Sequence, residues 1–107
     1  MKPVVKNLFA DLPASSSRED FRTLVQTPNV RVERIVSNGQ CSAADFWYDQ
    51  PEDEWVLLVQ GTASLLFDDG CTALLKAGDY LHIARHVKHR VVETSLDAVW
   101  LAIYYST

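Results

Sequence analysis

Two segments of the chain carry most of the side chains that could do chemistry. The first contains Tyr48, Gln50 and Glu54, and the second ends at His89 after His82 and His86. Imidazole, carboxylate and amide groups bind ions and polar ligands, and a phenol can donate a proton. If the two segments meet in space, their side chains form one polar site.

Local chain geometry favours such a meeting. Tyr48 and Gln50 lie two residues apart, so in an extended segment they share one face. A turn through 51–53 would bring Glu54 back opposite them, while His89 would arrive from a different hairpin. We therefore expect these side chains to converge on the interior of a β-structure.

The elements that must position these residues are short strands. From Asn29 onward, runs rich in Val, Ile and aromatic residues alternate with Gly, Asp, Asn and Pro, which is typical of strands joined by turns. Asp68-Asp69-Gly70 indicates a hairpin turn, because glycine supplies the positive φ that such turns require. We expect about seven strands, with the shortest merging, from the runs 30–37, 43–49, 54–60, 62–67, 71–76, 80–84, 90–94 and 99–105. The pattern predicts an all-β sandwich or barrel.

The first residues differ from this pattern. We expect a single domain over 1–107, made of an N-terminal arm (1–28) and a β-barrel (29–107). The run Ser15–Ser17 is interpreted as a hinge. Ser17 with Asp20 resembles a capping box, which predicts at most one short helix, of no more than two turns, through residues 21–25.

Two of the expected strands carry apolar residues on both faces. In residues 54–60 one face carries valine and leucine and the other carries tryptophan, leucine and valine, and residues 99–105 behave in the same way. Only one face of a strand in a small barrel meets the core, so the N-terminal arm or a second subunit must cover the other face. We prefer a homodimer.

The composition argues against several partners. A formal net charge of −4 has the wrong sign for binding a nucleic acid. The sequence has no apolar stretch of about 18 residues and no signal-peptide core, so we expect no membrane partner and a cytoplasmic protein. Cys41 and Cys71 are too few for a disulfide framework and are expected to be buried or half-buried. Glu19, Asp20 and Glu33 are interpreted as surface carboxylates.

The layout of the first polar segment resembles a motif of the cupin superfamily. That motif is a glycine, five residues, H-x-H, three or four residues, a glutamate, six residues and a glycine. Glu54 and Gly61 match it with the same six-residue gap, while Tyr48 and Gln50 occupy the two histidine positions. The resemblance covers about two-thirds of the chain.

The second cupin motif is a glycine, five residues, P-x-G, two residues, a histidine, three residues and an asparagine. Gly78 and His89 match it. Three other residues stand where the motif has proline, glycine and asparagine: Ala84, His86 and Glu93. The spacing of the family is therefore kept, but two of its usual three histidines are absent.

The resemblance implies a jelly-roll β-barrel that holds a divalent metal ion, such as iron, manganese, nickel or zinc. Cupins hold the ion by the histidines and the glutamate that point into the barrel, which leaves Gln50, Glu54 and His89 as metal ligands here. Tyr48 would be a proton donor beside them, and Phe46 with Tyr48 would line the space for a small-molecule ligand. An amide is a poorer ligand than an imidazole, so we expect weaker metal binding than in a full cupin site.

One ligand position has an alternative. If four residues precede Glu54 in the motif, Trp47 and Asp49 take the histidine positions, and Asp49 replaces Gln50 as the ligand. We favour Gln50, because Tyr48 then lines the interior while the charged Asp49 faces outward.

The remaining histidines and the basic residues near them have less specific interpretations. His82 lies opposite the core side of its strand, which makes it a surface or subunit-contact residue, and His86 is placed in a loop near the barrel mouth. Arg85, Lys88 and Arg90 form either a solvated basic face or an attraction for an anionic substrate at the mouth.

Three functions are consistent with these residues. The chain could be a metal-dependent enzyme acting on a small polar substrate, a metal-free ligand-binding or sensory barrel without catalysis, or a structural barrel in which Glu54 and His89 only pair with each other. We favour a barrel that binds a small molecule and a divalent metal. Catalysis is left open, because cupins host dioxygenases, isomerases, decarboxylases and epimerases, and a fold does not select one reaction.

Overall fold

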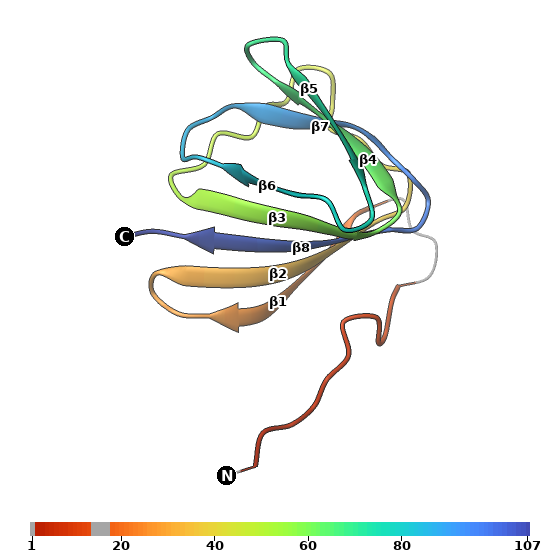
Figure 1. Cartoon of the computed structure of the whole chain (residues 1–107), viewed down its shortest axis with the longest axis vertical. Helices are drawn as coiled ribbons and strands as arrows, with labels where there is room; N and C mark the ends of the chain where they lie inside the picture. The colour runs from red at the N-terminus through yellow and green to blue at the C-terminus, as the bar shows by residue number, and fades with distance from the viewer. Residues whose placement is uncertain (1, 14–17) are drawn as a thin grey trace.

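The chain folds as two facing antiparallel sheets (Figure 1). The computed structural model describes residues 2–13 and 18–107, which contain eight strands and no helix, and therefore no helix that could cross a membrane. The strands are β1 (Asp20–Gln26), β2 (Val30–Ser37), β3 (Asp53–Gln60), β4 (Thr62–Phe67), β5 (Thr72–Lys76), β6 (Tyr80–Ile83), β7 (His89–Thr94) and β8 (Ala98–Tyr105). One sheet has the order β1-β2-β8-β3-β6 and the other has the order β5-β4-β7. The expected all-β jelly roll is confirmed.

The chain passes between the sheets at Gly61, which is the only residue between β3 and β4. Its φ is +91°, and a Cβ at this position would lie 2.4 Å from Ser95 Oγ and 2.9 Å from Ala98 Cα. Positive φ and this close approach both require glycine. The corner fixes where the chain leaves the larger sheet and enters the smaller one.

The hydrophobic core lies between the two sheets. Val56 of β3 pairs with Ala102 of β8, and Leu58 pairs with Trp100. Leu65 of β4 belongs to the same buried cluster. Because paired residues of adjacent strands point to the same face, this register places alternate residues of β3 and β8 inward.

The outer face of the five-stranded sheet is also apolar, as the sequence predicts. Trp55 pairs with Ile103, and Leu57 pairs with Leu101. All four are only half-buried, because the three-stranded sheet covers the opposite face. These side chains remain available for packing against something else.

The N-terminal arm is held to this outer face by Arg34. The guanidinium of Arg34 is buried, and its Nη1 donates to the carbonyl oxygens of Leu8 at 3.1 Å and Ala10 at 2.7 Å. Its Nη2 lies 3.5 Å from a carboxylate oxygen of Asp20. The residues that precede Leu8 extend away from the sheets (Figure 1), and Val5 among them is 96% exposed.

The structure corrects the expectation for the residues before the barrel. A helical turn through 21–25 is predicted from the sequence, but these residues form β1, which pairs with β2 from Asp20↔Val36 to Gln26↔Arg31. A sheet edge supplies backbone partners along the whole segment, which outweighs a single capping motif. The sheet therefore begins at Asp20. The expected hinge Ser15–Ser17 and the expected cap at Ser17 lie outside the described residues.

Two further expectations are wrong. Residues 43–49 form no regular strand, and only Tyr48 makes an isolated antiparallel bridge, to His89. Cys41 and Cys71 are free and exposed rather than buried. Residues 43–49 and both cysteines lie in loops, where composition predicts neither strand pairing nor burial.

Candidate functional site

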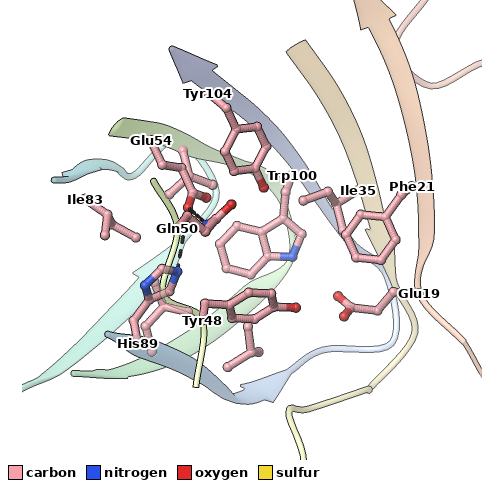
Figure 2. A pocket seen from close by; sticks show the side chains of 13 residues that line it. Glu19, Phe21, Ile35, Tyr48, Gln50, Glu54, Ile83, His89, Trp100 and Tyr104 are labelled. Carbon is pink, nitrogen blue, oxygen red and sulfur yellow. Dashed lines mark hydrogen bonds and ion pairs between the residues drawn. The ribbon is translucent and has the colours of Figure 1, made fainter. Parts of the chain in front are cut away.

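A pocket between the sheets brings together the polar residues singled out in the sequence (Figure 2). Its walls are aliphatic and aromatic, and its volume of about 60 Å³ has room for only a few water-sized groups. Polar side chains reach it from two strands, from the loop before β3 and from the segment before β1. They are Glu19, Tyr48, Gln50, Glu54 and His89.

Glu54 is the buried acid of this pocket. It lies on the inner face of β3, paired with Tyr104 of β8 and Ile83 of β6, and is 7% exposed. Burial raises the pKa of Glu54 to about 7, although the hydrogen bond from Gln50 Nε2 at 3.0 Å and the charge of Arg31 oppose the rise. Its proton is therefore exchanged near neutral pH.

His89 faces Glu54 from the start of β7. Its Nδ1 lies 3.0 Å from the carbonyl oxygen of Val87, and a carbonyl can only accept, so Nδ1 carries the proton and Nε2 carries the lone pair. Burial lowers the pKa of His89, and the imidazole is neutral at neutral pH. Nε2 lies 3.6 Å from Glu54 Oε1. Burial thus favours the neutral form of both the Glu54 carboxyl group and the His89 imidazole, which disfavours a salt bridge between them.

Tyr48 and Gln50 reach the pocket from an irregular loop. The backbone N–H of Tyr48 donates to the carbonyl of His89 at 2.7 Å, and His89 donates back at 3.1 Å. This bridge stacks the Tyr48 ring on the imidazole, with ring centroids 5.4 Å apart and planes at 22°. Burial raises the pKa of Tyr48, and the charges of Glu19 and Glu54 raise it further, so the phenol keeps its proton.

A second carboxyl group, Glu19, enters the pocket from the segment before β1. Its Oε2 accepts a hydrogen bond of 2.6 Å from Ser37 Oγ, which in turn accepts one of 3.2 Å from Trp100 Nε1. Figure 2 shows the Glu19 carboxylate between the ring of Phe21 and the hydroxyl end of Tyr48. The buried Trp100–Ser37 pair therefore fixes where this carboxylate lies.

The two residues proposed as alternatives in the first motif, Gln50 and Asp49, lie in different places. Gln50 lines the pocket and bonds to Glu54. Asp49 is exposed and its carboxylate lies 2.8 Å from His86 Nδ1 at the surface. The expected inward direction of Gln50 and outward direction of Asp49 agree with this geometry.

Other predicted residues lie outside the pocket. Phe46 was expected to line the ligand space, but it is 46% exposed and packs edge-on against Tyr48, with ring centroids 4.8 Å apart. The loop before Tyr48 is not a strand, so strand alternation does not place Phe46 inside. The side chains of His82 and His86 are exposed by 51% and 64%, as their surface interpretation predicts.

The basic residues near His89 make contacts away from the pocket. Arg85 pairs with Asp53 at 3.5 Å. Arg90 donates to the carbonyl oxygens of Ser42, at 3.2 Å, and Ala44, which holds the loop against β7. These two arginines therefore stabilise the loops beside the barrel.

Among the polar and aromatic residues of the pocket, sequence reasoning missed four: Glu19, Phe21, Trp100 and Tyr104. The first two were missed because their segment was interpreted as a helix with surface carboxylates. For the last two, the alternation of the 99–105 strand carried a usable signal, since Trp100 and Tyr104 fall on one face with Ala102 between them.

The donor set fits a divalent metal ion only in part. His89 Nε2 and Glu54 Oε1 are good ligands at a spacing that one ion could bridge. Gln50 offers an amide oxygen, but its Nε2 is the atom that contacts Glu54, so the amide would have to turn over. No group of three His, Cys, Asp or Glu side chains that could hold an ion occurs in the described part of the chain. An ion here would rest on two strong ligands and one weak ligand.

The arrangement also suits proton exchange without a metal. Glu54 with a pKa of about 7 can act as an acid or a base near neutral pH, and the lone pair of His89 Nε2 can accept a proton. The 3.6 Å separation of the two atoms leaves both available to a ligand. A polar group bound between them would contact an acid and a base at once.

Comparisons with known proteins agree with this fold. The family model for the cupin domain matches residues 34–104. A candidate mannose-6-phosphate isomerase from Ralstonia eutropha is 40% identical, with a TM-score of 0.93 over 98% of this chain and 100% of that chain. A cupin superfamily protein from Desulfitobacterium hafniense is 20% identical, with a TM-score of 0.77 over 90% of this chain and 84% of that chain. An RmlC-like cupin from Shewanella frigidimarina is 13% identical, with a TM-score of 0.75 over 100% and 93% of the two chains. No curated protein matches the sequence.

Proposed function

The chain belongs to the cupin family, and from that premise we propose that its barrel binds a small polar molecule in the pocket beside Glu54 and His89. The observation that carries the proposal is the convergence of Gln50, Glu54 and His89 on one cavity with apolar and aromatic walls. A small apolar cavity with a few converging polar groups is the usual form of a ligand site. The walls supply binding energy, and the polar groups select the ligand.

The test is ligand-observed NMR with a library of small neutral polar molecules, in the presence of a chelator. The wild type is compared with a Glu54→Gln, His89→Gln double variant, which keeps the volume of the site, and with Glu93→Gln, whose side chain is exposed on β7. We expect the control to bind like the wild type and the double variant to bind about thirtyfold more weakly, since each of the two lost buried hydrogen bonds costs about 1 kcal/mol. Equal affinities in all three proteins would place the binding site elsewhere.

A second candidate function includes a divalent metal ion held by Gln50, Glu54 and His89. The orientation of His89 favours it, because a histidine that ligates a metal commonly donates its other ring N–H to a carbonyl, as Nδ1 is placed to do toward Val87. When bound, the ion would polarise an oxygen atom of the ligand. The chain would then be a metal-dependent enzyme, with Tyr48 as the proton donor.

Elemental analysis tests the metal directly. Protein purified without chelator or nickel resin, and also protein exposed to iron, manganese, nickel or zinc, should hold one ion per chain. A folded Glu54→Ala, His89→Ala variant should hold none. A wild-type chain that stays metal-free after exposure to all four ions would end this candidate.

The name of the Ralstonia protein suggests isomerisation of a sugar phosphate, a reaction that this pocket fits only in part. Sugar isomerisation moves a proton between neighbouring carbon atoms, and Glu54 with His89 could exchange such a proton. A phosphate group also needs a cationic partner, and none of the pocket-lining residues found in the described ranges is Lys or Arg. The pocket therefore has residues suited to the proton transfer of such a reaction, but it has no cationic residue that would bind the phosphate of its substrate.

We also propose that the chain forms a homodimer through the outer face of the five-stranded sheet. This face carries half-buried Trp55, Leu57 and Leu101, and the exposed arm runs away from its own sheets (Figure 1). In a two-fold dimer, each arm could lie on the sheet of the partner.

Two exposed free cysteines favour a reducing, cytoplasmic location.

Sedimentation of wild type, Leu57→Glu and Leu74→Glu proteins tests the dimer. Leu74 is 79% exposed on β5 of the other sheet, so its variant is the matched control. We expect the wild type and Leu74→Glu to be dimers at tens of micromolar and Leu57→Glu to be a monomer, because a buried unpaired charge opposes association. A monomeric wild type would refute the proposal.

A further inference from the structure

The charge of the pocket narrows the class of molecule that it can take. Two carboxyl side chains, Glu19 and Glu54, line it, and no lining residue identified within 2–13 and 18–107 is Lys or Arg. The lining therefore supplies two carboxyl groups and no permanently charged cation.

Arg31 is a cation close to the pocket, but neighbouring carboxylates offset its charge. The guanidinium of Arg31 lies 4.3 Å from the ring centroid of Tyr104, but it pairs with Glu33 and with Glu52, each at 3.3 Å. Two carboxylates thus face one cation at this edge of the site. An entering anion would meet more negative than positive charge.

Glu19 is placed to contact a bound group. Ser37 Oγ donates to its Oε2, and the Glu19 side chain lines the pocket. In Figure 2 the carboxylate lies near the ring of Phe21 and the hydroxyl end of Tyr48, and the Trp100 indole bonds to the same Ser37 hydroxyl as Glu19. A carboxylate next to several aromatic rings matches a cation that has an apolar body, because the faces of such rings also attract positive charge.

We propose that the pocket binds a small organic cation, an ammonium group on a short apolar body, in preference to a phosphorylated or other anionic molecule. The ammonium would bind at Glu19 among the rings of Phe21 and Tyr48, and the rest of the molecule would extend toward Glu54 and His89. This inference rests on the proposed function and names the chemical class of the ligand for that same pocket.

The test compares four probes of similar size on the full chain, with chelator, at about pH 8, where a primary amine is still protonated. They are propylammonium, propan-1-ol, propionate and inorganic phosphate, and binding is measured by ligand-observed NMR and calorimetry. We expect propylammonium to bind about tenfold more tightly than propan-1-ol, the affinity ratio for one ion pair and its ring contacts. Glu19→Gln should remove that advantage without changing propan-1-ol binding, and Glu93→Gln should change neither.

The outcomes separate this inference from the proposed function. If propionate or phosphate binds more tightly than propylammonium to the wild type, the inference is wrong while the proposed pocket stands. The same holds if propylammonium keeps its full advantage in a folded Glu19→Gln protein. If none of the four probes binds saturably, the proposed function fails and the inference fails with it. The preference of the wild type is measured without any variant, so a misfolded variant does not remove the test.

Discussion

Replacing Glu54 by glutamine should make the protein more stable at alkaline pH. Burial raises the pKa of Glu54 from 4.5 to about 7 in the folded chain, and in the unfolded chain the carboxyl group returns to its ordinary value. Between these two values the folded state binds a proton that the unfolded state has released. The stability that this proton contributes is fully present below about pH 4.5 and is lost as the pH rises through about 7.

The magnitude follows from the difference between the two pKa values. A difference of about 2.5 pH units corresponds to about 3 kcal/mol at 1.36 kcal/mol for each unit. The side chain is only 9% exposed, so solvent screens little of this cost. Glutamine keeps the shape and can still accept the hydrogen bond from Gln50, but it cannot ionise.

The assay is urea unfolding of metal-free wild type and Glu54→Gln, followed by tryptophan fluorescence, at a series of pH values from about 4.5 to 8.5. The two free energies of unfolding should be similar at the acidic end. They should diverge as the pH rises, until the variant is more stable by about 3 kcal/mol. Glu93→Gln, which changes an exposed carboxylate on β7, should run parallel to the wild type. A Glu54→Gln curve that is also parallel to the wild type would refute the reasoning, because Glu54 would then ionise alike in both states.

Three further substitutions test the elements that position the site. Gly61→Ala should lower the free energy of unfolding by about 2–4 kcal/mol, because φ is +91° and the new Cβ would meet Ser95 and Ala98. The control Gly70→Ala, at φ +90° with no atom within 4 Å, should lower it by only about 1 kcal/mol. Equal losses in chemical unfolding would contradict the clash at Gly61. Arg34→Ala should free the arm from the sheet and lower the free energy of unfolding by about 2–4 kcal/mol, because charge-assisted hydrogen bonds are lost. Limited proteolysis should then cut the arm faster than in the wild type. An unchanged rate of cleavage would show that Arg34 does not hold the arm. Ser37→Ala should lower the free energy of unfolding by about 1–3 kcal/mol, because Trp100 Nε1 and Glu19 both lose a buried hydrogen-bond partner. An unchanged midpoint of thermal unfolding would argue that these hydrogen bonds do not fix Glu19.

The strands of the barrel were largely predictable because their signals are local. The runs Val30–Ser37 and Thr62–Phe67 agree with the structure at both ends, and the glycines at 61 and 70 mark turns with positive φ. Hydrophobic alternation and turn chemistry act over a few residues, so they can be read without knowing what each strand packs against. The apolar outer face was visible in the same way.

Part of the site was predictable because family spacing reports which residues share a face. Tyr48, Gln50, Glu54 and His89 were expected to converge, and all four line one pocket. Phe46 was expected there too, but it lies outside, because an irregular loop does not alternate as a strand does. The metal, the ligand and any reaction remain predictions for these side chains.

Other features were decided only by the tertiary structure. A capping pattern at Ser17 and Asp20 predicts a helix over 21–25, yet residues 20–26 form β1, because an open edge of β2 supplies backbone partners that no local pattern reveals. That pairing carries Glu19 and Phe21 to the pocket. The sequence by itself therefore determined the barrel and one half of the site. The charge and the aromatic lining of the other half depend on contacts between residues far apart in the chain, such as Glu19 with Ser37 and Ser37 with Trp100, which form only when the sheets assemble.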